Sequence, residues 1–191
     1  MPNYAYTSHH ISGDAKEIQA FYDVLCRVRN HPEGPQRDSE YYGRMSFRHF
    51  LEGLCGEVPA IDLRGQICDF SVEGDCVIEM FTESAWSIPS EIHDLIRQRF
   101  PSFRILYFMD PDDEGVMATN DVDCEVFTTR YGITTEDEDE EFFDTVEEAC
   151  QWANLHLGVA ANTLEELRDA LFDYEEEHGM FVSLHECILD E

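Results

Sequence analysis

Basic side chains are scarce in this chain. Its 191 residues include 12 lysines and arginines against 42 aspartates and glutamates, and the formal net charge is -30. Binding to nucleic acid needs Lys and Arg to displace counterions from phosphates. A chain whose single lysine is Lys16 therefore does not fit direct binding to nucleic acid or to an anionic membrane. The charge fits a basic protein partner, or imitation of a nucleic acid, and the simpler alternatives are solubility and adaptation to salt.

Long apolar runs and cysteine pairs are also lacking. No apolar run approaches the ~20 residues that a membrane-spanning helix needs. The seven cysteines are odd in number, contain no C-x-x-C pair and follow no secretory signal, so we expect a reducing compartment, the cytoplasm. We expect no cofactor, because phosphate loops, dinucleotide fingerprints and cysteine spacings for iron–sulfur clusters are all lacking.

The chain does have the material for a folded core. Hydrophobic residues make up 43% of it, with 13 Phe and 8 Tyr. Its length suits one domain with a substantial appendage, or two small domains. The composition therefore argues against disorder of the whole chain despite the charge.

The N-terminal two thirds have the pattern of an α+β domain. Apolar residues alternate before Gly13, as in a strand, and Asp14 is suited to cap a helix. Two further alternating runs flank the turn residues 73–75, as in a β-hairpin. We expect strand, helix, strand, strand, helix, strand and an added strand, at 1–13, 14–29, 66–72, 76–81, 89–101, 103–109 and 116–130. An insertion at 31–65 carries a short helix near 46–54.

This order, β-α-β-β-α-β, is ferredoxin-like. Two stretches carry a further resemblance: Met1-Pro2-Asn3-Tyr4 with Ile11-Ser12-Gly13, and residues 81–89 (FTESAWSIP) ahead of Arg99-Phe100-Pro101. They resemble the YubB-type ferredoxin-like domains of plasmids, phages and conjugative elements. Tyr4-Ala5 stands where that family has Trp-Cys, and Ile88 where it has a first proline. The resemblance implies a fold and a mobile-element setting, and it supplies no catalytic residues.

The C-terminal part is the more densely acidic. We expect a ferredoxin-like domain over 1–133 and an acidic linker with a helical appendage over 134–191, which holds 19 acids and one base, Arg168. The run 136–141 is too self-repelling to fold alone, and is interpreted as a solvated linker or a site for a basic partner. Two capping boxes, Thr145 with Glu148 and Thr163 with Glu166, predict two helices.

The acids of this part are the candidate partner-binding residues, because they would meet a basic surface by charge complementarity. They are Glu136, Asp137, Glu138, Asp139, Glu140, Glu141, Glu165, Glu166, Asp173, Glu175, Glu176 and Glu177. The sequence thus favours a non-enzymatic interaction module. Its concrete form would be a DNA mimic that inhibits a host defence complex, as anti-restriction and anti-CRISPR proteins do. A structural accessory domain without a strong partner is the bland alternative.

A second candidate site is an acidic loop. Asp110, Asp112, Glu114 and Asp121, with Gly115, nearly match the spacing of a calcium-binding loop. The flanks have strand patterns where that loop needs helices, so a hairpin turn is the alternative. A metal-dependent regulator or enzyme using this loop is the rival function.

His185 and Cys187 alternate and would share one face of a strand, as a zinc pair or a Cys–His nucleophile does. A second pair with metal spacing is lacking. Packing within a sheet therefore explains them better.

Overall fold

The computed structural model describes residues 4–30, 43, 45–57, 64–85, 90–111, 116–136 and 140–190. The protein is a mixed α+β structure of two compact units. The first comprises Met1–Gly115 and Thr119–Asp121, and the second comprises Val116–Ala118 and Val122–Glu191. We expected the boundary between the two parts after residue 133, whereas the chain passes between the two units within residues 115–122.

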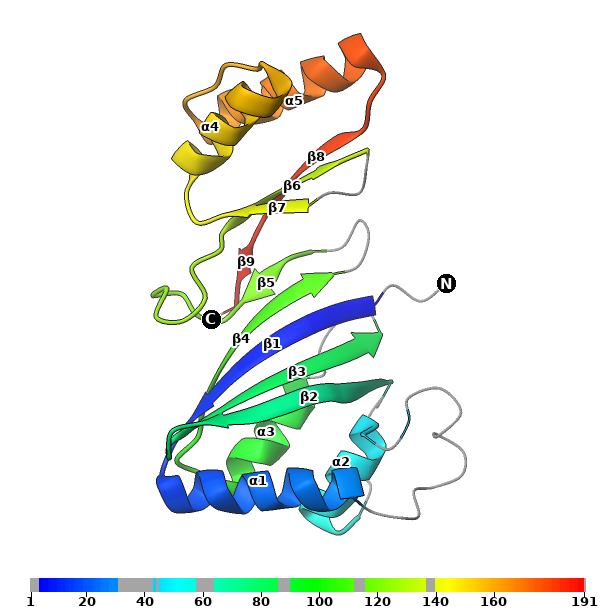
Figure 1. Cartoon of the computed structure of the whole chain (residues 1–191), viewed down its shortest axis with the longest axis vertical. Helices are drawn as coiled ribbons and strands as arrows, with labels where there is room; N and C mark the ends of the chain where they lie inside the picture. The colour runs from blue at the N-terminus through cyan, green and yellow to red at the C-terminus, as the bar shows by residue number, and fades with distance from the viewer. Residues whose placement is uncertain are drawn as a thin grey trace. The chain divides into compact units, whose positions relative to one another are not determined.

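The first unit is built on an antiparallel sheet with three helices on one face (Figure 1). Its strand order is β2-β3-β1-β4. The strands are β1 (Tyr4–Ser12), β2 (Gly65–Glu73), β3 (Val77–Ala85) and β4 (Arg104–Pro111). The helices are α1 (Ala15–Asn30), α2 (Phe47–Cys55) and α3 (Ser90–Arg99). The expected hairpin and the short helix of the insertion are confirmed, and residues 31–42, 44 and 58–63 lie outside the described residues.

Helical spacing of large apolar residues places α1 against the sheet. Asp14 accepts a hydrogen bond from the backbone N–H of Lys16 (2.9 Å), as expected of a helix cap. Phe21 is fully buried and packs edge-on against Phe50 and Phe103, with ring centroids 5.9 and 5.4 Å away. Such aromatic packing fixes the helices on the sheet.

Strict alternation along β1 gives the sheet two different faces. Ala5, Thr7, His9 and Ile11 point toward the helices and are buried, while Tyr6, Ser8 and His10 point to the other face. On β2 a bulge interrupts the alternation: Ile67 and Phe70 are buried, and both residues between them are exposed.

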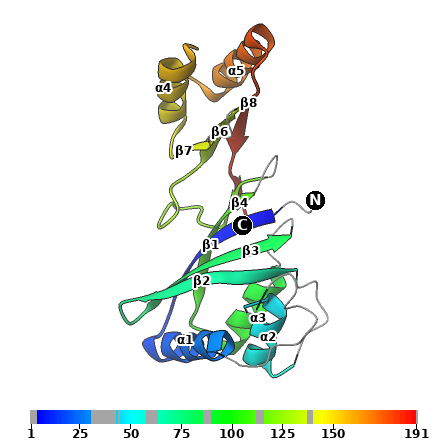
Figure 2. The same cartoon turned by 45° about the vertical axis from the view of Figure 1, so that its right-hand side comes forward.

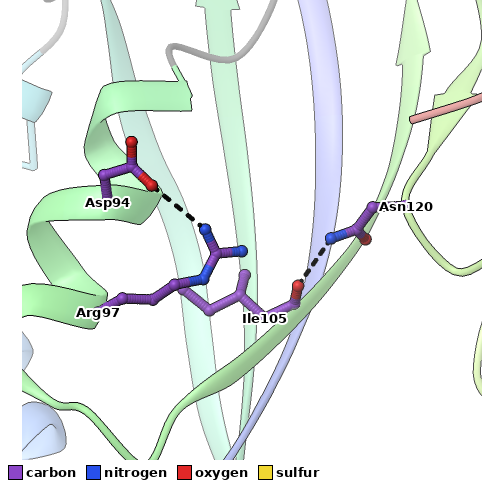
Figure 3. Close-up of polar contacts among 4 residues, drawn as sticks. All are labelled: Asp94, Arg97, Ile105 and Asn120. Atoms are coloured by element: carbon purple, nitrogen blue, oxygen red, sulfur yellow. Dashed lines mark hydrogen bonds and ion pairs between the residues drawn. The ribbon is translucent and has the colours of Figure 1, made fainter. Parts of the chain in front are cut away.

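Side chains continue the hydrogen bonding along β4. Asn120 accepts from the backbone N–H of Tyr107 (2.8 Å) and donates to the carbonyl of Ile105 (2.9 Å; Figure 3). The hydroxyl of Thr119 donates to the carbonyl of Tyr107 (2.5 Å). The neighbouring strand β5 (Ala118–Thr119) has only two residues, so these side chains satisfy backbone groups of β4 that a longer strand would otherwise satisfy. Figure 3 also shows the α3 ion pair between Arg97 and Asp94, with 3.4 Å between nitrogen and oxygen.

The strand expected over 116–130 is largely wrong. Only β5 (Ala118–Thr119) forms within it; residues 122–126 contain a turn and a bend, and residues 127–130 have no regular secondary structure. Cys124 has a φ of 56°, which is incompatible with a strand. The guanidinium of Arg130 donates to the carbonyls of Phe127 (2.9 Å) and Thr129 (2.8 Å) and so holds the segment in a local fold.

The second unit has its own antiparallel sheet, with the order β7-β6-β8, and two helices that pack on it (Figure 2). Its strands are β6 (Tyr131–Thr135), β7 (Glu140–Phe143) and β8 (Val182–Glu186), and the short β9 (Ile188–Leu189) follows them. Its helices are α4 (Val146–Leu157) and α5 (Leu164–His178). The core consists of Ile133, Phe143, Ala149, Cys150, Ala153, Leu167, Leu171 and Val182.

The acidic run after Thr135 is therefore not simply a linker. Its last two residues belong to β7, where Glu140 pairs with Thr134 and Glu141 with Ile133. The flanking residues Ile133 and Phe143 are buried in the core of the second unit, which holds both strands in place. Residues 137–139 lie outside the described residues.

Candidate functional site

The exposed side of α5 carries a dense group of carboxylates. At about 100° per residue, six carboxylates fall within roughly one third of the helix circumference. We call these residues the α5 acidic face: Glu165, Glu166, Asp169, Asp173, Glu176 and Glu177, all of which are exposed. Leu167 and Leu171 lie on the opposite side and are buried. The apolar stripe thus turns the carboxylates toward solvent.

Local sequence explains why α5 presents this face. The hydroxyl of Thr163 accepts from the N–H of Glu166 (3.2 Å), and the Glu166 carboxylate accepts from the N–H of Asn162 (2.9 Å). In α4 the capping box is complete, with Thr145 and Glu148 exchanging both hydrogen bonds. Acids in the first turn are also favoured by the helix dipole.

The structure brings together only part of the predicted partner-binding set. Glu165, Glu166, Asp173, Glu176 and Glu177 share the α5 acidic face. Glu175 is half-buried and lies off that face. Glu136 and Glu141 are exposed, while Glu140 is half-buried and burial raises the pKa of its carboxyl. Asp137, Glu138 and Asp139 lie outside the described residues.

Asp169 belongs to the α5 acidic face and was missed by the sequence analysis. Its signal was present, because it stands four residues after Glu165 and four before Asp173. Residues four apart lie on the same side of a helix.

The density of charge on α5 resembles that of a DNA strand. From Glu165 to Glu177 the helix rises about 18 Å at 1.5 Å per residue, which gives about one carboxylate per 3 to 4 Å. One strand of B-DNA carries one phosphate per about 3.4 Å.

An exposed aromatic residue borders the α5 acidic face. Phe172 is 60% exposed and stands three residues after Asp169 and four before Glu176. Large aromatic side chains anchor protein interfaces when a partner covers them. Phe172 therefore adds an apolar contact to a surface that is otherwise charged.

A groove of about 470 Å³ lies along α4 and β7 in the same unit. Trp152 and His156 stack along it, with ring centroids 4.7 Å apart, and Phe142 lies among the lining residues. Leu155 is 79% exposed beside them. Asp144 and Glu148 also line this groove, so it combines apolar rings with carboxylates.

The expected calcium loop is only partly described. Asp112, Glu114 and Gly115 lie outside the described residues, Asp110 is the second-to-last residue of β4, and Asp121 is buried with 1% exposure. The N–H of Asp121 donates to the hydroxyl of Thr119 (3.1 Å). Among the residues that the structure describes, no three His, Cys, Asp or Glu side chains lie close enough to hold a metal ion.

His185 in β8 and Cys187, which lies just after that strand, also show no metal geometry. The Nε2 of His185 lies 3.2 Å from the Thr134 hydroxyl, in a hydrogen bond between β8 and β6. Burial raises the pKa of the Cys187 thiol to about 11. A thiol with this pKa stays protonated at neutral pH, which argues against a nucleophile.

Two buried histidines form a polar site in the first unit that sequence reasoning missed. His9 and His93 pack edge to face, with ring centroids 5.3 Å apart, around a cavity of about 10 Å³ that Thr82 also lines. Burial lowers the pKa of both imidazoles, that of His93 to about 4. Both rings are therefore neutral at physiological pH. The signal was the presence of His and Thr at inward strand positions, where apolar residues are the norm.

Comparison with known proteins adds one structural likeness. No family model and no curated protein matches the chain. A crystal structure of an unknown protein from Galdieria sulphuraria is similar over 96% of this chain and 98% of that one, with 11% identity and a TM-score of 0.27. A TM-score at this level carries no argument about fold or function.

In the described part of the chain, no helix has the length and apolarity to cross a membrane.

Proposed function

We propose that this protein is a cytoplasmic, non-enzymatic interaction module that binds a basic protein surface through the α5 acidic face. The observation that carries the proposal is the segregation of six exposed carboxylates on one side of a helix, opposite the buried Leu167 and Leu171. Complementary charge speeds association and makes it sensitive to salt. Phe172 would supply the apolar contact at the border of the site.

The concrete form of this function is imitation of DNA. The average density of about one carboxylate per 3 to 4 Å along α5 supports it, since it is close to the density of phosphates along one strand. The partner would be a host nucleic-acid-binding protein, such as a component of a restriction or CRISPR complex.

We further propose that the first unit is a ferredoxin-like domain of the YubB type, carried by a mobile element. The order of its elements supports this: β1, α1, β2, β3, α3 and β4 follow one another, with α2 inserted, and the strands are arranged β2-β3-β1-β4. Part of the resembling segment, residues 86–89, lies outside the described residues.

The experiment is affinity capture from the native host at low and high salt. The test variant combines Glu165→Gln, Asp169→Asn, Asp173→Asn and Glu176→Gln. A matched control neutralises four exposed acids of the first unit, Glu52→Gln, Glu73→Gln, Asp75→Asn and Glu91→Gln, with the same change in net charge.

We expect the wild-type protein and the control to retain a basic partner at low salt, and the α5 variant to lose it. Duplex DNA added to the captured complex should release the partner if α5 imitates DNA. Equal loss in both variants would show an effect of net charge alone and would refute the proposal.

A further inference from the structure

The face of the first sheet that points away from the helices carries an ordered set of aromatic side chains. The register places Ser8, in the middle of β1, between Phe81 on β3 and Phe108 on β4. Because the serine side chain is small, the rings of Phe81 and Phe108 flank a depression over Ser8. Phe81 is 39% exposed, although rings of this size are usually buried.

A third ring closes one end of this arrangement. Tyr6 lies two residues before Ser8 on the same face, and its ring stacks on Phe81 with centroids 6.1 Å apart and planes at 3°. Opposite Tyr6 stand Asp110 on β4 and Glu83 on β3. The result is a hollow of about 420 Å³ lined by Tyr6, Ser8, Phe81, Phe108 and Asp110.

This chemistry selects for positive charge. The faces of aromatic rings attract cations, and the attraction grows when the cation is shielded from water. A carboxylate at the rim adds a direct opposite charge. Phosphate groups are disfavoured here, because Asp110 and Glu83 stand opposite Tyr6 on this face of the sheet, while Glu79 farther along it is paired with His10. These carboxylates therefore argue against the stacking of nucleic-acid bases on the three rings.

The size of the hollow indicates a small molecule. Ligand sites typically span about 300 to 1,000 Å³, so 420 Å³ suits a compact group and not a folded protein surface. The field of a protein with a net charge of -30 raises the local concentration of cations. We propose that this hollow binds a small organic cation with a quaternary or alkylated ammonium group, seated over Ser8 between the rings of Phe81 and Phe108.

The test is isothermal titration of the full chain with choline and with 3,3-dimethylbutan-1-ol, which has the same shape and no charge. We expect choline to bind saturably and the neutral alcohol to bind at least about tenfold more weakly. Phe81→Leu and Phe108→Leu keep apolar volume but remove a ring, and each should weaken choline binding by about tenfold. Ser8→Leu fills the centre of the hollow and should abolish binding.

Folding of each variant is checked by circular dichroism, and the hollow-filling and ring-removing variants test the site by different means. The α5 variant described above should bind choline like the wild-type protein, since the hollow uses none of its residues. Absence of saturable choline binding, equal binding of the neutral alcohol, or wild-type affinity in the folded Leu variants would each overturn the proposal. Tight binding of an arginine-rich peptide without binding of choline would also overturn it.

Discussion

His9 on β1 and Thr82 on β3 share a hydrogen bond of 3.0 Å between the Nε2 and Oγ1 atoms, and both residues are buried, with 0% and 1% exposure. They lie on the face that the helices cover, where His93 of α3 packs against His9. A buried imidazole in such surroundings is stable only while it is neutral, because burial of a charge costs far more than one hydrogen bond returns. The first unit therefore contains two imidazoles, those of His9 and His93, whose protonation would destabilise the fold.

We predict that acid destabilises the protein between pH 6.5 and about 4 through His9 and His93. The unfolded chain has ordinary imidazoles with a pKa near 6.5, whereas the folded pKa of His93 is about 4 and that of His9 is also lowered. The contribution of these two neutral histidines to folding stability is thus fully present above pH 6.5. Below pH 6.5 the unfolded state binds protons that the folded state does not bind. The free energy of unfolding therefore falls by up to about 1.4 kcal/mol per pH unit for each histidine.

Urea unfolding at pH 7, 6 and 5 measures this effect. Because the carboxylates also respond to acid, the informative quantity is the difference between the wild-type protein and His93→Gln. The variant should lose less stability between pH 7 and 5. Parallel pH dependence of the two proteins would contradict the prediction.

Thr82→Val should destabilise the first unit by about 1 to 3 kcal/mol, because it leaves the Nε2 of His9 without its buried partner while keeping the side-chain volume. Thr82→Ser, which keeps the hydroxyl, is the matched control and should cost less. Thermal and urea unfolding compare the two. A smaller loss for valine than for serine would show that the hydrogen bond does not govern stability here.

Much of the first unit could be predicted from the sequence, because its signals are local. Alternation around Gly74 marked the hairpin, and Asp14 marked the start of α1. The N-caps of α4 and α5 were equally legible, since Thr145 and Thr163 act within four residues of their partners, although only α4 forms the complete capping box. Periodicity and helix caps depend on residues that are close together in the sequence, so a single sequence is enough to reveal them.

The sheet of the second unit could not be predicted in the same way. Glu140 and Glu141 lie in β7 although their composition favours solvent, because Ile133 and Phe143 bury themselves beside them. Long-range pairing overrides a local preference in this case. The candidate site differs in this respect: the spacing of the acids along α5 is visible in the sequence, and the structure adds that Leu167 and Leu171 are buried while the carboxylates opposite them are exposed.

Asn120→Asp should destabilise the first unit by about 1 to 3 kcal/mol. The carboxylate keeps the acceptor for the N–H of Tyr107 but loses the donor to the carbonyl of Ile105, and it brings negative charge toward that oxygen. Gln98→Glu makes the same amide-to-acid change on the exposed side of α3 and should stay within about 0.5 kcal/mol. Urea unfolding of both variants decides the prediction, and equal losses would contradict it.

Gly53 permits the close packing of α1 and α2. A Cβ at this position would stand 2.6 Å from the Cγ2 of Val28, which is too close for two carbon atoms. Gly53→Ala should therefore destabilise the protein, although alanine is the better helix former by about 1 kcal/mol.

The double variant with Val28→Ala tests the cause of that loss. Removal of the Val28 methyl groups makes room, so Gly53→Ala should be neutral or stabilising in this background. The expected result is a clear coupling energy in a double-mutant cycle. Additive effects of the two changes would mean that the contact with Val28 is not the cause of the loss.

The interleaving of the two units along the chain constrains how the protein can be divided. Residues Val116–Ala118 belong to the second unit, and Thr119–Asp121 returns to the first before the chain leaves it again. A fragment that ends at residue 115 would strip Tyr107 and Ile105 of the side chains that complete their hydrogen bonds, whereas one that ends at 121 keeps them. Gene fusions, exchanges between relatives and isotope labelling of single units should accordingly use the later cut.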